Sequence, residues 1–215
     1  MTRGLLVTLE GIDGCGKSTQ VELLRNGMSQ KGIDHIVVRE PGGTAVGESV
    51  RQILLNNKYS PSLQSEMFLY MAARSELTGQ IIGPALKSGQ LVLCDRFTDS
   101  TLAYQGFGGG ADLEMIRNLS SIATGGIVPD LTILLDLPVE DAVGRRGASA
   151  DRMESKDISF HQRVRSGYLE IAHNEPGRIK IVNALSTVEE LGVIIWKLVE
   201  EIIVTKKNKR TAYEF

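Results

Sequence analysis

Eight consecutive residues near the start of the chain carry a pattern that is typical of phosphate binding. Residues 11–18 read Gly-Ile-Asp-Gly-Cys-Gly-Lys-Ser, which matches the spacing G-x-x-x-x-G-K-[ST]. Glycines let the backbone N–H groups of such a loop turn toward phosphate oxygens. The Lys17 ammonium would bind the outer phosphates of a nucleotide, and the Ser18 hydroxyl would bind Mg²⁺. The expected phosphate-binding residues are Gly11, Ile12, Asp13, Gly14, Cys15, Gly16, Lys17, Ser18 and Thr19.

The loop alone does not separate kinases, ATPases and regulatory GTPases. A GTPase would be expected to carry a guanine-reading segment of the form N-K-x-D. The nearest match in this chain is residues 57–60, Asn-Lys-Tyr-Ser, where Ser60 stands in place of the aspartate. The sequence therefore favours a kinase or an ATPase.

Short apolar runs alternate with helical patterns along the chain, and they must position this loop. An apolar run over 5–9 comes directly before the loop, and a helical spacing over 17–30 follows it. We predict four further strands, at 36–38, 91–94, 131–135 and 179–182. We predict further helices around 46–54, over 62–86, over 115–122 and from Ser186 onward.

Strands that alternate with helices predict an α/β fold with a parallel sheet wrapped by helices on both faces. Ligands of such folds bind at the carboxyl ends of the strands. Gly11, Pro41, Asp95 and Asp136 each follow a predicted strand. We therefore expect the functional residues to meet at this edge of the sheet.

The remaining segments suggest one domain with two appendages. We expect a single domain over 1–205, a mobile lid over about 143–156 and a frayed polar tail over 206–215. The lid prediction depends on residues 145–155, which are polar and have no apolar period. The last helix is expected to start at Ser186, with Glu189 completing a capping box.

Composition excludes several classes of protein. The 215 residues carry a net charge of −2, which argues against a protein that coats nucleic acid. No apolar run approaches the ~18 residues needed to cross a bilayer. The two cysteines, Cys15 and Cys94, cannot form a disulfide framework. We expect a cytoplasmic protein without nucleic-acid or membrane partners.

Further motifs resemble those of the thymidylate kinase family of the bacterial type. The matching segments are Arg-Glu-Pro-Gly-Gly-Thr at 39–44, Phe68 with Ala-Ala-Arg at 72–74, Asp-Arg-Phe at 95–97, and Ser100 with Ala-Tyr-Gln-Gly at 103–106. The match extends from the first strand to about Ala172. The resemblance implies a P-loop nucleoside monophosphate kinase fold with five strands, usually as a homodimer. It implies the transfer of the ATP γ-phosphoryl group to dTMP, giving dTDP and ADP in dTTP biosynthesis, with Mg²⁺.

The resemblance also implies how the acceptor phosphate and the metal are held. Arg96 would clamp the phosphate of dTMP, assisted by Arg39 and Arg51, because a guanidinium grips phosphate oxygens with two parallel hydrogen bonds. Asp95 occupies the position of a carboxylate that organises Mg²⁺ beside Ser18.

The nucleoside part of dTMP has its own set of implied contacts. Phe68 would stack on the thymine ring and Arg74 would donate to a base carbonyl, while Ser100 and Gln105 would bind the base edge. Tyr104 would crowd the sugar 2′ position, and Asp13 would hold the 3′-hydroxyl. Glu170 resembles a residue that lies near the acceptor or the metal in some relatives.

Phosphoryl transfer also needs positive charge at the transferring group. The four variable positions of the loop contain no arginine, so this charge must come from elsewhere. The polar segment offers Arg145, Arg146 and Arg152, which matches the class of thymidylate kinases with lid arginines. We predict that Arg152 is the arginine finger and that Arg145 or Arg146 grips donor phosphates. The predicted catalytic set is Lys17, Arg152, Arg96 and Asp95.

Two other functions compete with this one. A kinase could act on another nucleoside monophosphate or on a deoxynucleoside, although a nucleoside kinase would not need the clamp at Arg96. A P-loop ATPase switch would have no small acceptor, and the second anion clamp at 95–96 argues against it.

Overall fold

The computed structural model describes residues 3–145 and 151–212, and the strands within them form one parallel sheet. The sheet order is β2-β3-β1-β4-β5, and every neighbouring pair is parallel. The strands are β1 (Leu5–Glu10), β2 (His35–Arg39), β3 (Leu91–Asp95), β4 (Leu131–Asp136) and β5 (Ile179–Asn183). All five predicted strands are present, so the predicted fold class is confirmed.

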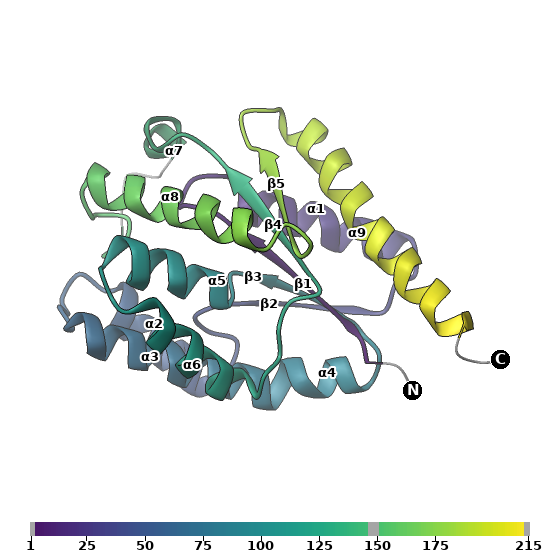
Figure 1. The fold of residues 1–215 in the computed structure, drawn as a ribbon, viewed down its shortest axis with the longest axis horizontal. Coiled ribbons are helices and arrows are strands. Elements are labelled where there is room, and N and C mark those ends of the chain that lie inside the picture. Colours follow the sequence, from purple (N-terminus) through teal and green to yellow (C-terminus); the bar gives the residue numbers. More distant parts are fainter. Residues whose placement is uncertain (1–2, 146–150, 213–215) are drawn as a thin grey trace.

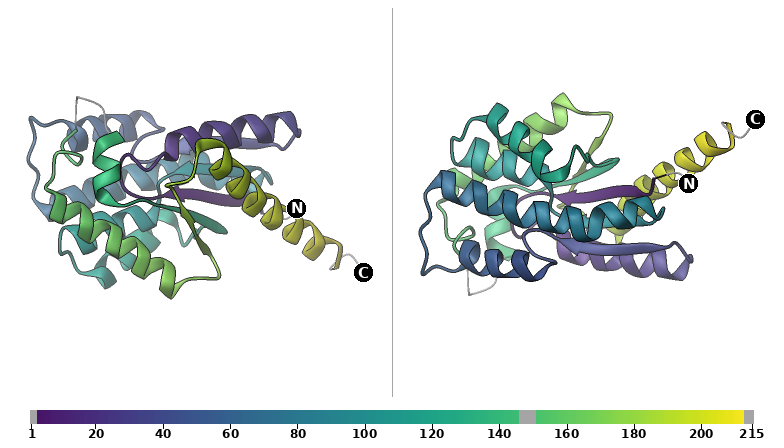
Figure 2. Two further views of the ribbon diagram at one scale, coloured as in Figure 1. Left: turned by 90° about the horizontal axis from the view of Figure 1, so that it is seen from above. Right: turned by 90° about the horizontal axis from the view of Figure 1, so that it is seen from below.

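Helices cover both faces of this sheet (Figures 1 and 2). The larger ones are α1 (Lys17–Gln30), α2 (Ala45–Leu55), α3 (Leu63–Leu77), α6 (Leu113–Thr124), α8 (Ile158–Asn174) and α9 (Val188–Ala212). The shorter ones are α4 (Gly83–Lys87), α5 (Thr98–Thr101), α7 (Val139–Arg145) and two π-helical turns, η1 (Thr78–Ile82) and η2 (Leu102–Gly108). Helices α1 and α9 pack against one another, and α8 lies across the opposite face with η2 (Figure 2).

The central strand β1 is buried along its whole length, as its apolar sequence predicts. Leu6, Val7 and Leu9 are fully buried between the two helical layers. Cys94 on the neighbouring strand β3 is also fully buried. This rigid centre fixes the carboxyl ends of β1 and β3, from which the phosphate loop and the Asp95–Arg96 pair extend.

The helix from α3 through η1 to α4 confirms the helical pattern expected over 62–86. Ser62 caps its start, since its side chain accepts a hydrogen bond from the backbone N–H of Ser65. Pro84 lies in this continuous helix just after the π-helical turn η1. Within the part of the chain that the structure describes, no helix is long and apolar enough to cross a membrane.

Two expectations about the last helix are wrong. The capping box forms one residue later than predicted: Thr187 and Glu190 each bond the other's backbone N–H with their side chains. The helix also continues through 206–212, where we expected a frayed tail. No glycine or proline interrupts that stretch, and the Lys206 ammonium donates to the Gly4 carbonyl over 2.6 Å.

The expected lid also differs in part. Residues up to Arg145 belong to helix α7, and residues 146–150 lie outside the described residues. Beyond them, Met153 is 4% exposed and packs in the main core, so the expectation of an exposed loop is wrong for this part. Met153 is the one apolar residue within 151–156, so the sequence pattern did not indicate its burial.

Candidate active site

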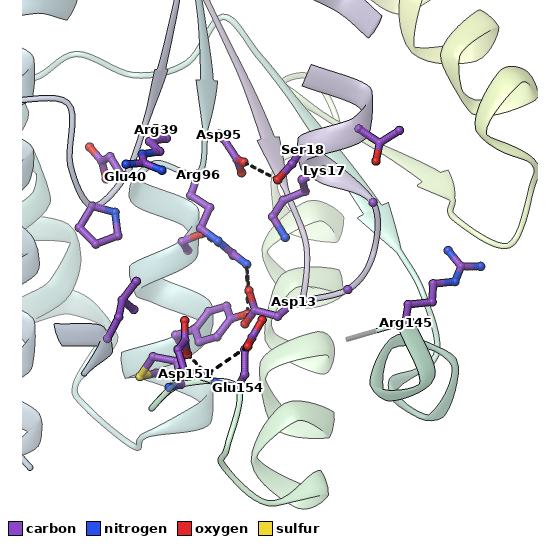
Figure 3. Close-up of a pocket in the computed structure, with 18 of the residues that line it drawn as sticks. Asp13, Lys17, Ser18, Arg39, Glu40, Asp95, Arg96, Arg145, Asp151 and Glu154 are labelled. Atoms are coloured by element: carbon purple, nitrogen blue, oxygen red, sulfur yellow. Dashed lines mark hydrogen bonds and ion pairs between the residues drawn. The ribbon is translucent and has the colours of Figure 1, made fainter. Parts of the chain in front are cut away.

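A cavity of about 860 Å³ opens at the carboxyl ends of the strands, where the sheet topology predicts a ligand site. Its wall includes the phosphate loop, the ends of β2 and β3, the α5–η2 segment and helix α3. Asp95, Arg96, Lys17 and Ser18 lie together in this space (Figure 3). One cavity thus joins the donor-phosphate loop to the residues predicted for the acceptor.

The phosphate loop has the backbone that its glycines permit. Gly14 adopts a φ of +88°, and a Cβ at this position would lie 2.4 Å from the Ala142 carbonyl oxygen. The Lys17 ammonium folds back on the loop and donates to the carbonyls of Gly11 and Ile12, at 3.0 and 2.9 Å. Its charge is therefore concentrated where the loop would surround phosphate.

The side chains of Ile12 and Cys15 point away from any ligand. Ile12 is 2% exposed and Cys15 is fully buried, both as part of the main core. The Cys15 sulfur lies 3.6 Å from the Lys17 ammonium. These two residues can contribute only their backbone to phosphate binding, and their side chains anchor the loop from behind.

The residues predicted to hold Mg²⁺ offer oxygen atoms in a suitable arrangement. The Ser18 hydroxyl donates to Asp95 Oδ2 at 3.4 Å, and Asp95 Oδ1 is buried without a protein hydrogen-bond partner. Hydroxyl and carboxylate oxygens suit Mg²⁺, which keeps most of its ligands as water and phosphate. Residues 3–145 and 151–212 contain no group of three or more His, Cys, Asp or Glu side chains that could hold a metal ion. Glu170 is exposed on α8 and does not line the cavity.

Arg96 occupies a left-handed backbone conformation with a φ of +69°, unlike every other described residue that is not glycine. Its guanidinium donates to the Gly11 carbonyl at 3.0 Å and to Asp13 Oδ1 at 2.5 Å. It also lies over the Tyr104 ring, 5.1 Å from the ring centre, while the Tyr104 hydroxyl donates to Asp13 Oδ2. A buried cation is thereby fixed beside the phosphate loop.

Two further arginines line the same cavity on the β2 side. The Arg51 guanidinium donates to the Pro41 carbonyl at 2.8 Å, and its burial, with Arg39 nearby, lowers its pKa. Arg39 is more exposed and pairs with Glu48 at 3.3 Å. Both guanidinium groups are close enough to the cavity to assist Arg96 with an anion.

Arg74 is 1% exposed and is held on several sides. It donates to Glu40 at 2.8 Å, and to the Phe97 carbonyl and the Thr101 hydroxyl at 3.0 Å each. Burial raises the pKa of Glu40, and the charge of Arg74 opposes that rise. This network fixes the guanidinium of Arg74 in the wall where a base was expected.

The aromatic residue in that wall is Tyr70, which the sequence interpretation missed. Phe68 is 49% exposed and lies outside the cavity, so its expected place beside the base is wrong. Tyr70 lines the cavity four residues before Arg74, and residues four apart share one helix face. The six-residue spacing from Phe68 to Arg74 places them on different faces, and this signal could have identified Tyr70.

Gln105 is 2% exposed and lines the cavity, as does Ser100. Its amide donates to Glu66 Oε1 at 2.7 Å. The other carboxylate oxygen of Glu66 accepts from Arg152 at 2.5 Å. Arg152 also donates to the Leu54 carbonyl at 2.7 Å and is absent from the residues that line the cavity. The predicted finger thus lies against helix α3 in this structure.

Arg145 is the lid arginine that lines the cavity within the described residues. It ends helix α7 and donates to the Ala184 carbonyl at 3.2 Å. Arg146 lies outside the described residues. Of the predicted donor-side arginines with a described position, Arg145 has the more direct access.

The sheet order and the phosphate loop define a P-loop nucleoside monophosphate kinase fold, which the solved structure described below shares. A profile of the family "Thymidylate kinase" matches residues 9–193. The chain belongs to the thymidylate kinase family, whose members are phosphotransferase enzymes.

Individual relatives agree with this assignment. The thymidylate kinase of Kosmotoga olearia is 43% identical over 189 residues, which cover 87% of this chain and 91% of the relative. That of Desulforudis audaxviator is 46% identical over 203 residues, covering 93% and 92%. The crystal structure of the thymidylate kinase from Ehrlichia chaffeensis superposes with a TM-score of 0.78 at 33% identity, covering 92% of this chain and 99% of that one.

Proposed function

We propose that this chain transfers the γ-phosphoryl group of ATP to dTMP, giving dTDP and ADP. The observation that carries the proposal is the single cavity shared by the Lys17 loop and the buried Arg96 clamp. Two anion sites in one cavity suit a reaction that joins a triphosphate donor to a phosphorylated acceptor.

In this proposal the donor end is bound by the loop. Its backbone N–H groups and Lys17 would hold the outer phosphates of ATP, and Ser18 with Asp95 would hold Mg²⁺. The metal would neutralise charge on the transferring group. Arg145, which lines the cavity, would supply further positive charge on the donor side. Arg152 would act there only after leaving Glu66.

At the acceptor end, each group of residues would hold one part of dTMP. Arg96 would grip the phosphate, with Arg39 and Arg51 beside it. Asp13 and Tyr104, which are already bonded to one another, would meet the sugar. Tyr70 in place of Phe68 would stack on the base, because it is the aromatic side chain of α3 that lines the cavity. Arg74, Ser100 and Gln105 would face the base edge.

An ADP-release assay with a panel of acceptors tests the proposal. We expect dTMP to be turned over with a higher kcat/KM than dUMP, dCMP or dAMP. A preference for another monophosphate, or for an unphosphorylated deoxynucleoside, would move the chain to a different kinase activity. ATP hydrolysis that is indifferent to every acceptor would indicate an ATPase switch instead.

A homodimer is a further part of the proposal. Large apolar side chains are exposed on α3 and α6, among them Phe68, Met115 and Ile122, and their burial in a shared interface would be favourable. Light scattering should then give twice the 23.4 kDa of one chain. We also propose a cytoplasmic location with no nucleic-acid or membrane partner; fractionation of cells would test the location.

A further inference from the structure

Glu10 is a fully buried carboxylate that has no role in the proposed reaction. It ends strand β1 immediately before the phosphate loop, and it does not line the cavity. Its Oε1 accepts from the backbone N–H of Phe97 at 2.7 Å. Its Oε2 accepts from the Ser100 hydroxyl at 2.5 Å and from the Tyr168 hydroxyl at 2.9 Å. Three donors from two other parts of the fold thus converge on one side chain.

The same two hydroxyls also meet Arg96. Its Nη1 lies 3.3 Å from the Ser100 oxygen and 3.3 Å from the Tyr168 oxygen. A guanidinium can only donate, and a hydroxyl has one proton and two lone pairs. Nη1 has two protons and gives one to the Gly11 carbonyl at 3.0 Å, so the two hydroxyls accept its other proton between them and send their own protons elsewhere. Glu10 is the acceptor that receives them, with the 2.7 Å contact between Ser100 and Tyr168 as the other route for one proton.

Glu10 also holds the backbone on the far side of Arg96. The N–H of Arg96 donates to the Leu9 carbonyl at 3.0 Å, and the N–H of the next residue, Phe97, donates to Glu10. The last two residues of β1 therefore accept hydrogen bonds from both peptide N–H groups that flank the left-handed Arg96. This conformation is unfavourable for a residue with a Cβ, so it needs such support.

We propose that Glu10 is a positioning residue for Arg96, acting through Ser100, Tyr168 and the Phe97 peptide to aim the guanidinium at the acceptor phosphate. The inference rests on the proposed function and names a residue that contacts neither substrate. Its consequence is that loss of Glu10 weakens binding of the phosphorylated acceptor while the donor site is spared.

The charges around Glu10 give this role a pH dependence. Burial raises the pKa of Glu10 from 4.5 to about 7; Asp99 adds to the rise, whereas Ser100, Arg96 and the Phe97 N–H oppose it. The other titratable groups around it are Cys94 on β3, whose pKa the charge of Glu10 helps to raise, Tyr168 on α8, Asp13 beside Arg96, and Arg178, which pairs with Asp99 at 2.7 Å. A protonated Glu10 becomes a donor and can no longer accept from both hydroxyls.

The test compares Glu10→Gln with Asp130→Asn. Asp130 is a matched control because its carboxylate likewise accepts a backbone N–H: its Oδ2 accepts that of Leu6 in β1 at 2.8 Å, at the end of the strand away from the cavity. In Glu10→Gln we expect the KM for dTMP to rise about tenfold or more, since hydrogen bonds to charged groups contribute about 1.5–3 kcal/mol. The KM for ATP should stay within about twofold. Asp130→Asn should lower the Tm and leave both KM values unchanged.

The pH profile separates positioning from a general structural role. The phosphate of dTMP has its own pKa near 6, so kcat/KM for dTMP should fall at low pH in every variant. In the wild type a second fall should occur near pH 7, where Glu10 becomes protonated. That second fall should be missing in Glu10→Gln.

Three results would overturn the inference, and a fourth would refute the proposed function on which it rests. An unchanged KM for dTMP in folded Glu10→Gln overturns it, and so do equal rises in the KM for dTMP and for ATP. If Glu10→Gln does not fold, Tyr168→Phe removes one link and keeps the carboxylate; it should raise the KM for dTMP about threefold or more, and no rise would overturn the inference. A wild type that ignores dTMP would instead refute the proposed function.

Discussion

The Arg152 guanidinium and the Glu66 carboxylate form an ion pair of 2.5 Å between the segment after α7 and helix α3. The side chains are 11% and 7% exposed, so the pair is nearly buried. Glu66 in addition accepts the Gln105 amide. Arg152 is therefore part of the packing around the cavity as well as a possible source of charge.

Arg152→Ala should destabilise the protein by about 2–4 kcal/mol, because it leaves a buried carboxylate without its cation. Urea unfolding would measure this loss. The double variant with Glu66→Gln should recover part of it, since the uncompensated charge is then gone. A stability equal to that of the wild type would show that Arg152 is mostly exposed to solvent and not paired with Glu66. Single-turnover rates of the same variant report separately on any role in phosphoryl transfer.

Tyr70→Ala should raise the KM for dTMP by about tenfold to a hundredfold, since base–aromatic stacking contributes about 1–3 kcal/mol. Phe68→Ala is the matched control on the same helix, two residues away and outside the cavity. Steady-state kinetics with dTMP as the varied substrate would measure both. If Phe68→Ala strongly raises the KM for dTMP without changing the oligomeric state, Phe68 stacks on the base, as the sequence predicts.

Lys17→Ala should abolish phosphoryl transfer without unfolding the protein. Within residues 3–145 and 151–212 the ammonium hydrogen-bonds to the Gly11 and Ile12 carbonyls and the Cys15 sulfur, so its removal disturbs few contacts, whereas the donor phosphates lose their nearest cation. Circular dichroism should remain native. Appreciable dTDP formation by the variant would contradict the role of the loop.

The stability of the wild type should fall as pH rises through the range in which Glu10 ionises. A carboxyl whose folded pKa is raised favours the folded state fully below its unfolded value of 4.5, and this advantage disappears as pH rises through about 7. The Tm should therefore drop more steeply between these values in the wild type than in Glu10→Gln. Parallel Tm curves for the two proteins would show that Glu10 keeps its proton or its charge throughout.

The sequence is informative where the functional group and its support are adjacent in the chain. The phosphate loop, its preceding strand and its following helix all lie within residues 5–30, so local pattern predicts their arrangement. Asp95 and Arg96 lie at the end of β3, and the parallel pairing of β3 with β1 brings them beside that loop. The confirmed five-strand sheet follows from simple alternation of apolar and helical segments.

The missed features depend on contacts between distant residues or on helical phase. Glu66 and Arg152 are 86 positions apart, and nothing local to either indicates the pair. Tyr70 is distinguished from Phe68 only by which side of α3 faces the cavity. The burial of Glu10 requires donors from the β3–α5 connection and from α8 to be brought together. Long-range packing, absent from a linear pattern, decides the Glu66–Arg152 pair and the burial of Glu10, whereas the four-residue spacing to Arg74 distinguishes Tyr70 locally.

The burial of both cysteines gives the protein an internal reporter. Cys15 lies behind the phosphate loop and Cys94 inside β3, and both are fully buried; burial also raises the pKa of the Cys94 thiol. A thiol reagent can reach either sulfur only when the structure opens, so its labelling rate measures the free energy of opening. Because the two sulfurs lie in different parts of the core, their separate rates distinguish local release of the loop from opening of the whole sheet. Labelling rates of the wild-type protein, measured with and without each nucleotide, would therefore show how much that nucleotide raises the free energy of opening.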